Sequence, residues 1–291
     1  MRRTQTDARC RAADVVSPSV ARSDQNRDIA GDTAGVGVEV LNSVTVVTGG
    51  ASGLGAGVVE AVVAAGGRSL IADRDSQRSQ ELVERLGERV RYVQTDVADE
   101  ASVANAVDAA MSWGPLRYVV NCAGVAWTQR TVGTSGAAHD LQGFERIMRV
   151  NLLGTFNVMR LAAAAMATLD PIDSDGERGV IVNTASIAAF DGQAGQVAYA
   201  ASKGGIVSMT LPAARDLAAL GIRVNAVCPG HMDTPMLQLL PSEQRADLAD
   251  PIPFPHRLGT PEDFASLVLE VLRNRYLNGS VLRLDGALRT P

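Results

Sequence analysis

Lysine is almost absent from this chain of 291 residues. Of its 27 basic residues, Lys203 is the single lysine, and the other 26 are arginines. Cysteine and histidine are scarce as well, with three of each, and aromatic residues make up 4% of the chain. The cysteines lie far apart, as do the histidines, so neither set shows the spacing of a metal site or of a disulfide framework. We therefore expect no metal ion and a reducing compartment.

Two further absences narrow the class of protein. The formal net charge is −5, which gives no support for a nucleic-acid partner. No apolar run approaches the roughly 20 residues that cross a bilayer as a helix, so we expect no membrane-spanning segment. Hydrophobic residues make up 46% of the chain. That content and length suffice for one large α/β domain or two small ones.

The first 40 residues differ from the rest in composition. Residues 1–30 contain six arginines and four aspartates with almost no periodic apolar residues, and we expect 1–40 to be a disordered arm. The aspartates argue against an organellar transit peptide, and the segment lacks the apolar core of a secretory signal. A start codon assigned too far upstream is an equal alternative. We expect the folded domain to span 41–291.

From residue 43 onward, short apolar runs alternate with helix-like segments. The apolar runs are continuous, as is typical of strands buried on both faces of a parallel sheet. The alternation predicts a single Rossmann-type α/β domain, with a doubly wound parallel sheet of about seven strands and helices on both faces. We expect strands at 43–48, 68–73, 90–94, 117–121, 179–184, 223–227 and 281–284, and helices at 56–65, 102–113, 144–168, 198–220 and 261–273.

A glycine-rich segment follows the first expected strand and opens the first helix. Glycines let the backbone turn tightly and approach a pyrophosphate, and the helix start offers free N–H groups and a positive dipole end. In this context the segment predicts a dinucleotide-binding loop; a tight turn without a ligand is the alternative. The expected contact residues are Gly49, Ser52, Gly53, Leu54 and Gly55.

The second expected strand ends at Asp73, 18 residues beyond Gly55. A carboxylate at this strand end can bind the ribose hydroxyls of adenosine and repels a 2′-phosphate, which favours NAD over NADP. Arg74 follows directly and weakens the inference, because a guanidinium attracts phosphate. The alternative for Asp73 is a helix cap or a turn residue.

The single lysine lies four residues after Tyr199, on an expected helix. Residues at i and i+4 share one helix face. An ammonium group beside a phenol favours the phenolate and lowers the tyrosine pKa. We therefore expect Tyr199 to exchange a proton with a substrate hydroxyl. The alternative explanation is that an arginine-biased genome left this one lysine by chance.

Together, the glycine loop, Asp73 and Tyr199-x-x-x-Lys203 resemble the short-chain dehydrogenase/reductase family over roughly residues 40–290. The resemblance implies a catalytic tetrad of Asn151, Ser186, Tyr199 and Lys203. It also implies that Ser186, Tyr199 and Gln193 contact the substrate. Three of these residues have an alternative explanation: Ser186 could cap a loop, Asn151 could be a polar interruption of a helix, and Gln193 could be a surface turn residue. Further cofactor contacts implied are Asp96, Val97, Asn121, Cys122, Ala123, Gly124, Tyr199, Lys203, Pro229, Gly230, Met232 and Thr234.

Further segments resemble, within that family, the type II 3-hydroxyacyl-CoA dehydrogenases. They are 192–196, 202–207, 209–212, 253–255, 257–259, 277–279 and 283–286. This resemblance implies NAD-dependent interconversion of 3-hydroxyacyl-CoA and 3-oxoacyl-CoA, and possible action on hydroxysteroids. It also implies a homotetramer and a compartment that is cytoplasmic in a bacterium or mitochondrial in a eukaryote. Residues 231–258 are expected to form a mobile lid over an apolar cleft, with a subunit contact as the alternative.

Two other functions remain open from the sequence. A 3-oxoacyl-acyl-carrier-protein reductase that uses NADPH shares the fold and the tetrad, and Asp73 argues against it. A scaffold subunit that binds NAD without essential catalysis is the second. Turnover with NADH against NADPH discriminates the first, and rescue of the deletion phenotype by a Tyr199→Phe protein would favour the second.

Overall fold

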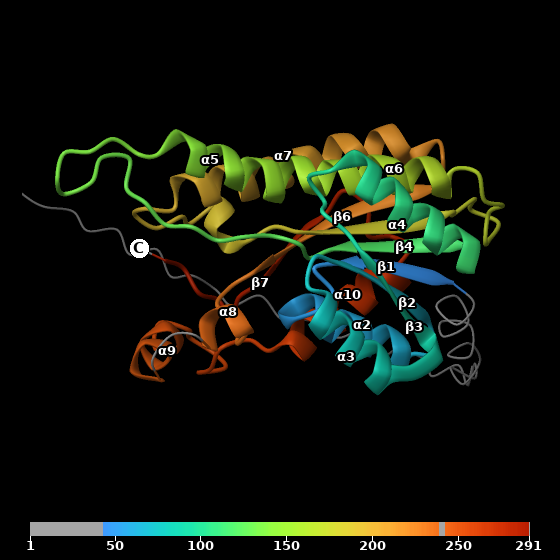
Figure 1. Cartoon of the computed structure of the whole chain (residues 1–291), viewed down its shortest axis with the longest axis horizontal. Coiled ribbons are helices and arrows are strands. Elements are labelled where there is room, and N and C mark those ends of the chain that lie inside the picture. Colours follow the sequence, from blue (N-terminus) through green and yellow to red (C-terminus); the bar gives the residue numbers. More distant parts are fainter. Residues whose placement is uncertain (1–42, 239–241, 291) are drawn as a thin grey trace, which may run out of the picture.

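A seven-stranded parallel sheet organises the chain. The computed structural model describes residues 43–238 and 242–290, so the arm expected at 1–40 lies outside the described residues. The strand order is β3-β2-β1-β4-β5-β6-β7 (Figure 1). The chain first adds β2 and β3 on one side of β1, and then adds β4 to β7 on its other side, as in a doubly wound sheet. The strands are β1 (Val44–Thr48), β2 (Arg68–Asp73), β3 (Val90–Gln94), β4 (Leu116–Asn121), β5 (Gly179–Thr184), β6 (Ile222–Pro229) and β7 (Val281–Leu284).

Helices cover both faces of this sheet, which confirms the predicted fold class (Figure 1). On one face lie α2 (Gly53–Ala64), α3 (Ser76–Leu86) and α10 (Pro261–Arg273), and on the other lie α4 (Glu100–Trp113), α6 (Gly154–Met166) and α7 (Val197–Ala218). The continuous apolar runs form the strands because residues pointing to either face become buried; all residues of β1, β4, β5 and β6 are buried.

Two helix predictions were incomplete. The expected helix 144–168 is three segments, α5 (Leu141–Ile147), a π-helical turn (Met148–Leu153) and α6. A π turn keeps the local apolar pattern while widening the backbone, so periodicity does not reveal it. Helix α3 was missed, because its few apolar residues sit among charged ones.

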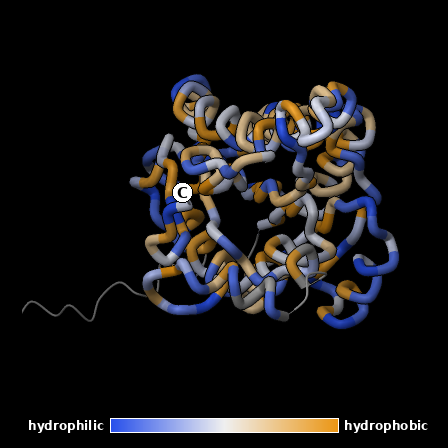
Figure 2. The backbone as a smooth tube through the Cα atoms, turned by 90° about the vertical axis from the view of Figure 1, so that its left-hand side faces the viewer, coloured by the Kyte–Doolittle hydropathy of each residue, from blue (hydrophilic) through white to orange (hydrophobic). Residues whose placement is uncertain are grey.

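All seven strands are parallel, so their carboxyl ends gather at one edge of the sheet. Figure 2 looks onto the end of the molecule where the expected lid segment and the last described residues of the chain lie, with helices of mixed hydropathy above and below. The expected lid region contains two short helices, α8 (Pro235–Gln238) and α9 (Ser242–Ala249). Leu239 and Leu240, which were expected to belong to the lid, lie outside the described residues.

A buried ion pair fixes β6, whose end reaches this edge. The Arg223 guanidinium donates to Glu177 at 2.7 Å and to four backbone carbonyls at the end of α10 and beyond. Both side chains are about 6–7% exposed. Full hydrogen bonding offsets the desolvation of the two charges, so the pair orients β6 against α10.

No helix among the described residues combines the length and the apolar character needed to cross a bilayer.

Candidate active site

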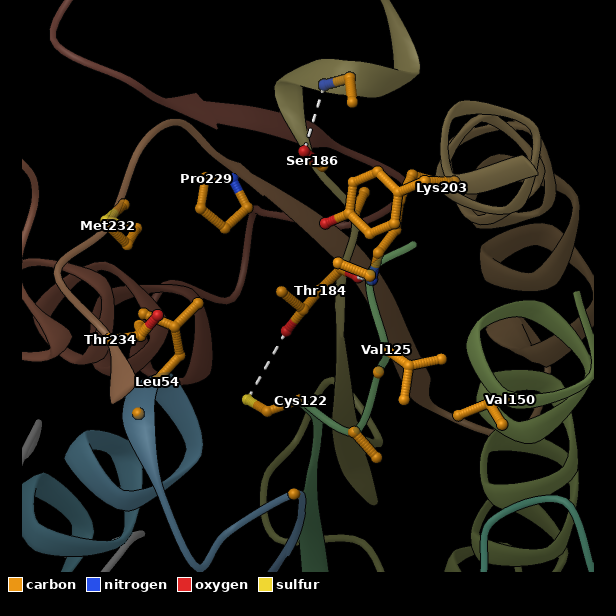
Figure 3. Close-up of a pocket in the computed structure, with 18 of the residues that line it drawn as sticks. Leu54, Cys122, Val125, Val150, Thr184, Ser186, Lys203, Pro229, Met232 and Thr234 are labelled. Atoms are coloured by element: carbon orange, nitrogen blue, oxygen red, sulfur yellow. Dashed lines mark hydrogen bonds between the residues drawn. The ribbon is translucent and has the colours of Figure 1, made fainter. Parts of the chain in front are cut away.

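A pocket of about 550 Å³ opens at the carboxyl edge of the sheet. It brings together side chains from both halves of the chain, as ligand sites in doubly wound sheets do. Every residue predicted to contact cofactor or substrate lines it except Asn121, and among the predicted tetrad only Asn151 does not. Figure 3 shows Leu54, Thr234 and Met232 on one side of this space and Val125 and Val150 on the other.

The glycine loop forms a close backbone cradle. Gly49 and Gly53 adopt positive φ angles of 63° and 53°, which side chains rarely allow. A Cβ atom on Gly55 would lie 2.1 Å from the carbonyl oxygen of Gly49. The side chain of Ser52 does not cap α2, and its first turn contains no acidic residue. Free N–H groups therefore face the pocket, which suits the pyrophosphate of a dinucleotide.

Asp73 faces the same end of the pocket and also holds the loop. Its carboxylate accepts hydrogen bonds from the backbone N–H groups of Ala51 and Asp75, each at 3.0 Å. The turn-residue alternative for Asp73 is met by these contacts. Asp73 also lines the pocket beside Arg74, and its contact with the ribose stays a prediction. Selection between NAD and NADP stays a prediction.

Asn121 lies behind the pocket wall. Its amide donates to Asn183 at 2.9 Å and accepts from Thr48 at 3.3 Å. The Thr48 hydroxyl in turn accepts from the N–H of Ala123, which lines the pocket. Asn121 therefore ties the ends of three strands together, and the predicted direct contact with cofactor is not supported. Sequence reasoning missed Thr48, whose hydroxyl joins β1 to the segment after β4.

Lys203 is 5% exposed and reaches the pocket floor from α7. Its ammonium donates to the carbonyl oxygen of Thr184 at 2.8 Å. Burial lowers the pKa of Lys203 to about 8, since a desolvated ammonium is costly. The neighbouring Cys122 thiol accepts a 3.6 Å hydrogen bond from the Thr184 hydroxyl (Figure 3). Burial raises the pKa of Cys122 to about 11, so this thiol is neutral at physiological pH.

The predicted lowering of the Tyr199 pKa is wrong for this structure. Burial raises the pKa of Tyr199, and a hydrogen bond with the Ser186 side chain opposes that rise. The Lys203 ammonium lies 5.7 Å from the centre of the Tyr199 ring and donates to Thr184 instead. Desolvation outweighs the pairing that the i, i+4 spacing suggested, although the two side chains do share one helix face.

Ser186 begins a 3-10 helix, Ile187–Ala189. Its hydroxyl accepts from the N–H of Ala188 at 3.1 Å (Figure 3). The loop-cap alternative is therefore correct as local geometry. The hydroxyl also interacts with Tyr199 and faces the pocket. This hydrogen bond fixes the side-chain rotamer of Ser186, which suits a group that must hold a substrate oxygen in place.

Asn151 is fully buried on the π-helical turn. Its amide donates to the carbonyl of Val125 at 2.9 Å and to Ser202 at 3.1 Å, and its oxygen accepts from the N–H of Val125 at 2.8 Å. A Cβ on Gly124 would lie 3.3 Å from the Asn151 oxygen and 3.6 Å from the Lys203 nitrogen. Asn151 thus stands beside Lys203, behind Gly124, and its relay role stays a prediction.

The substrate end of the pocket contains Gln193, whose side chain is exposed and whose N–H donates to Gln196 at 3.0 Å. Met232 of the lid segment is buried, and Thr234 lies within 3.4 Å of a Cβ built on Gly53. The lid therefore meets the glycine loop; its mobility stays a prediction. Sequence reasoning missed further residues at the pocket, namely Trp127, Thr128, Arg146, Asp191 and Thr290.

Among the described residues, no group of three or more His, Cys, Asp or Glu side chains is arranged to hold a metal ion.

Comparisons with known proteins agree on one family. The family model described as short chain dehydrogenase matches residues 43–245. The chain is 48% identical to 3-hydroxyacyl-CoA dehydrogenase type-2 of Drosophila melanogaster and 47% identical to that of Homo sapiens; each match covers 86% of this chain and 98% or 96% of the relative. A crystal structure of 3-hydroxyacyl-CoA dehydrogenase type-2 from Mycobacterium avium matches with a TM-score of 0.83 and 45% identity, over 86% of this chain and 96% of that one.

Burial of Lys203 predicts a variant that gains stability while losing activity. The pKa of Lys203 falls from 10.5 to about 8 on folding. Its charge therefore opposes folding fully below pH 8, and this penalty disappears as the pH rises through 10.5. Lys203→Met should raise the free energy of unfolding at pH 7 by about 2 kcal/mol, because about 3 kcal/mol of penalty is removed and about 1 kcal/mol of hydrogen bonding is lost.

Urea unfolding of both proteins between pH 7 and 10.5 checks this, and the difference should shrink with rising pH. Arg85→Met is the matched control, because Arg85 is exposed and pairs with Glu60 outside the pocket. The difference in free energy of unfolding between Arg85→Met and wild type should not change with pH. A Lys203→Met protein that is less stable than wild type at every pH would contradict the burial argument.

Proposed function

The chain belongs to the short-chain dehydrogenase family, and on that premise we propose that it interconverts 3-hydroxyacyl-CoA and 3-oxoacyl-CoA with NAD. As a family member it is an oxidoreductase that uses a nicotinamide cofactor. One observation carries the proposal for the chemistry: Tyr199, Ser186 and Lys203 line one pocket together with the glycine cradle. The acyl-CoA substrate is proposed because the curated relatives at 46–48% identity carry that name.

We assign each catalytic residue a role in this reaction. When bound, the cofactor supplies the group that accepts the hydride from the carbinol carbon of the substrate. Tyr199, as phenolate, takes the proton of the substrate hydroxyl. Ser186 donates to the same oxygen, where charge develops as the proton leaves. Lys203 holds the cofactor ribose beside the phenol, and Asn151 anchors a water that passes the proton toward solvent.

The raised pKa of Tyr199 predicts how the rates of alcohol oxidation and ketone reduction change with pH. Because the phenolate is the active base, alcohol oxidation should increase as the pH rises toward the pKa of Tyr199. Ketone reduction needs the neutral phenol as the acid, so it should be fastest at lower pH.

A substrate panel tests the function. Purified protein with NAD should oxidise 3-hydroxyacyl-CoA esters faster than 17β-hydroxysteroids or acyl-carrier-protein thioesters, followed as NADH absorbance. Tyr199→Phe should lose at least about a thousandfold of kcat, within the range for removal of a general base, while retaining cofactor affinity. Turnover confined to hydroxysteroids or to carrier-protein thioesters would disprove the proposed substrate, and full activity of Tyr199→Phe would disprove the proposed base.

Cofactor choice rests on Asp73. Its carboxylate lines the end of the pocket away from the tetrad, and a 2′-phosphate placed there would meet a like charge. Asp73→Asn removes the charge while an amide oxygen can keep one of the two backbone hydrogen bonds. By calorimetric titration, wild type should bind NAD much more tightly than NADP, and Asp73→Asn should narrow the ratio by at least about tenfold, or 1.4 kcal/mol. Equal affinities in the wild type would refute NAD preference.

We also propose a homotetramer. Large apolar side chains are exposed on α6 and α7, including Phe156 at 48% and Leu211 at 44%, and such faces commonly meet a second subunit. Light scattering should give four times the chain mass of 30.5 kDa, and Phe156→Asp should reduce it. A monomer mass for the wild type at micromolar concentration would contradict the proposal.

A further inference from the structure

The chain after β7 makes a tight turn that returns to the pocket. Gly286 and Ala287 have positive φ angles of 58° and 67°; for Ala287 this conformation costs about 1 kcal/mol or more. The turn is closed by hydrogen bonds from the N–H of Leu288 and of Ala287 to Asp285. It brings Thr290 to the lining of the pocket. We call residues 285–290 the C-terminal turn.

Arg283 joins this turn to the loop between Ser186 and Tyr199. Its guanidinium donates to the carboxylate of Asp191 at 2.6 Å, to that of Asp285 at 2.7 Å and to the carbonyl of Leu288 at 3.1 Å. It also lies 5.5 Å from the centre of the Phe190 ring. The Arg283 side chain is only 23% exposed, so these interactions are less screened than those of a surface ion pair.

Asp191 connects Arg283 to the residue that holds the substrate oxygen. Its N–H donates to the carbonyl of Ile187 at 2.8 Å, in the 3-10 helix that Ser186 begins. The carbonyl of Asp191 accepts from the hydroxyl of Thr290. Both Asp191 and Thr290 line the pocket. The turn and the Ser186 helix are therefore linked by side chains and backbone at the pocket itself.

Apolar packing makes the same connection and extends it to the lid segment. Leu288 is fully buried in a cluster with Ile187 and Ile252, and Leu258 packs against it. A Cβ on Gly286 would lie 2.7 Å from the side chain of Ile252. The C-terminal turn thus sits between the 3-10 helix that Ser186 begins and the segment that follows α9.

The strand order places this turn at the substrate end of the site. Strand β7 is one edge of the sheet. Asp73, which ends β2, and Asp96, which comes after β3, lie toward the opposite edge, where the adenosine is predicted. A group added by β7 can therefore shape the substrate end without touching the adenosine end.

We propose that Arg283 is a positioning residue that clamps the C-terminal turn against Asp191, so that the turn forms a wall of the substrate pocket and limits the acyl length it accepts. The acyl part of this statement rests on the proposed function. Without Arg283, the carboxylates of Asp191 and Asp285 lose the cation that they share. Asp285 keeps its pair with the exposed Arg289, but the ionic link between the turn and Asp191 is lost, and the wall opens.

The test compares three variants of the full-length protein with wild type. Arg283→Met removes the clamp, Arg283→Lys keeps the charge but not the forked contacts, and Arg85→Met removes the remote ion pair with Glu60 as a matched control. The measurements are NAD affinity, and kcat and KM for 3-hydroxyacyl-CoA esters of increasing length. Hydrogen exchange of the C-terminal peptide, without substrate, reports directly whether the turn is released.

Arg283→Met should raise KM by about tenfold or more, equivalent to 1.4 kcal/mol, with a smaller change in kcat and NAD affinity within twofold. It should also relax the preference for chain length and speed exchange in the turn. Arg283→Lys should recover part of each change, and Arg85→Met should resemble wild type. In a double-mutant cycle, adding Asp191→Asn to Arg283→Met should raise KM little further.

Three outcomes would overturn the proposal. The first is fast exchange in the turn with unchanged KM and length preference, and the second is a parallel loss of NAD and substrate affinity, which marks a purely structural role. Slow exchange in Arg283→Met would also overturn it, because the clamp would then be dispensable. If wild type oxidises only hydroxysteroids, the proposed substrate fails, and the same KM comparison with a steroid still tests the wall.

Discussion

The hydrogen bond from the buried Lys203 ammonium to the carbonyl of Thr184 is the constraint on which the site depends. It joins α7 to the end of β5, and so fixes the helix that carries Tyr199 against the strand that leads into Ser186. Arginine serves as the cation everywhere else in this chain, yet its planar fork is bulkier than the compact ammonium that fits here. The one lysine of the chain thus lies where a compact ammonium fits and where burial lowers its pKa.

Around this point the sheet divides the site into two ends. The glycine cradle and Asp73 belong to the half built from β1 to β3, and the residues proposed to hold substrate belong to the half built from β5 to β7. The two ends are held by different interactions: backbone N–H groups and a carboxylate at one, and the Arg283 clamp at the other. Because the two ends are held separately, a change at one end need not disturb the other.

The fold and the gathering of the site residues were predictable, because continuous apolar strands, glycine spacing and the Tyr199–Lys203 interval are local patterns. The errors have physical reasons. The sign of the Tyr199 pKa shift depends on burial, which no spacing reports. The π turn at Asn151 keeps an ordinary apolar pattern, and Asn121 is turned toward neighbouring strands. The pair between Asp191 and Arg283 spans 92 residues, so only the folded chain reveals it.

The protonation of Lys203 itself can be measured directly, because a protein with one lysine labelled with ¹⁵N gives a single side-chain ammonium signal. Its chemical shift, followed against pH in the protein without cofactor, reports the pKa of that group alone. Desolvation predicts a midpoint near 8, well below the ordinary value of about 10.4. A midpoint at that ordinary value would contradict the burial of the ammonium and the hydrogen bond from which the site is built.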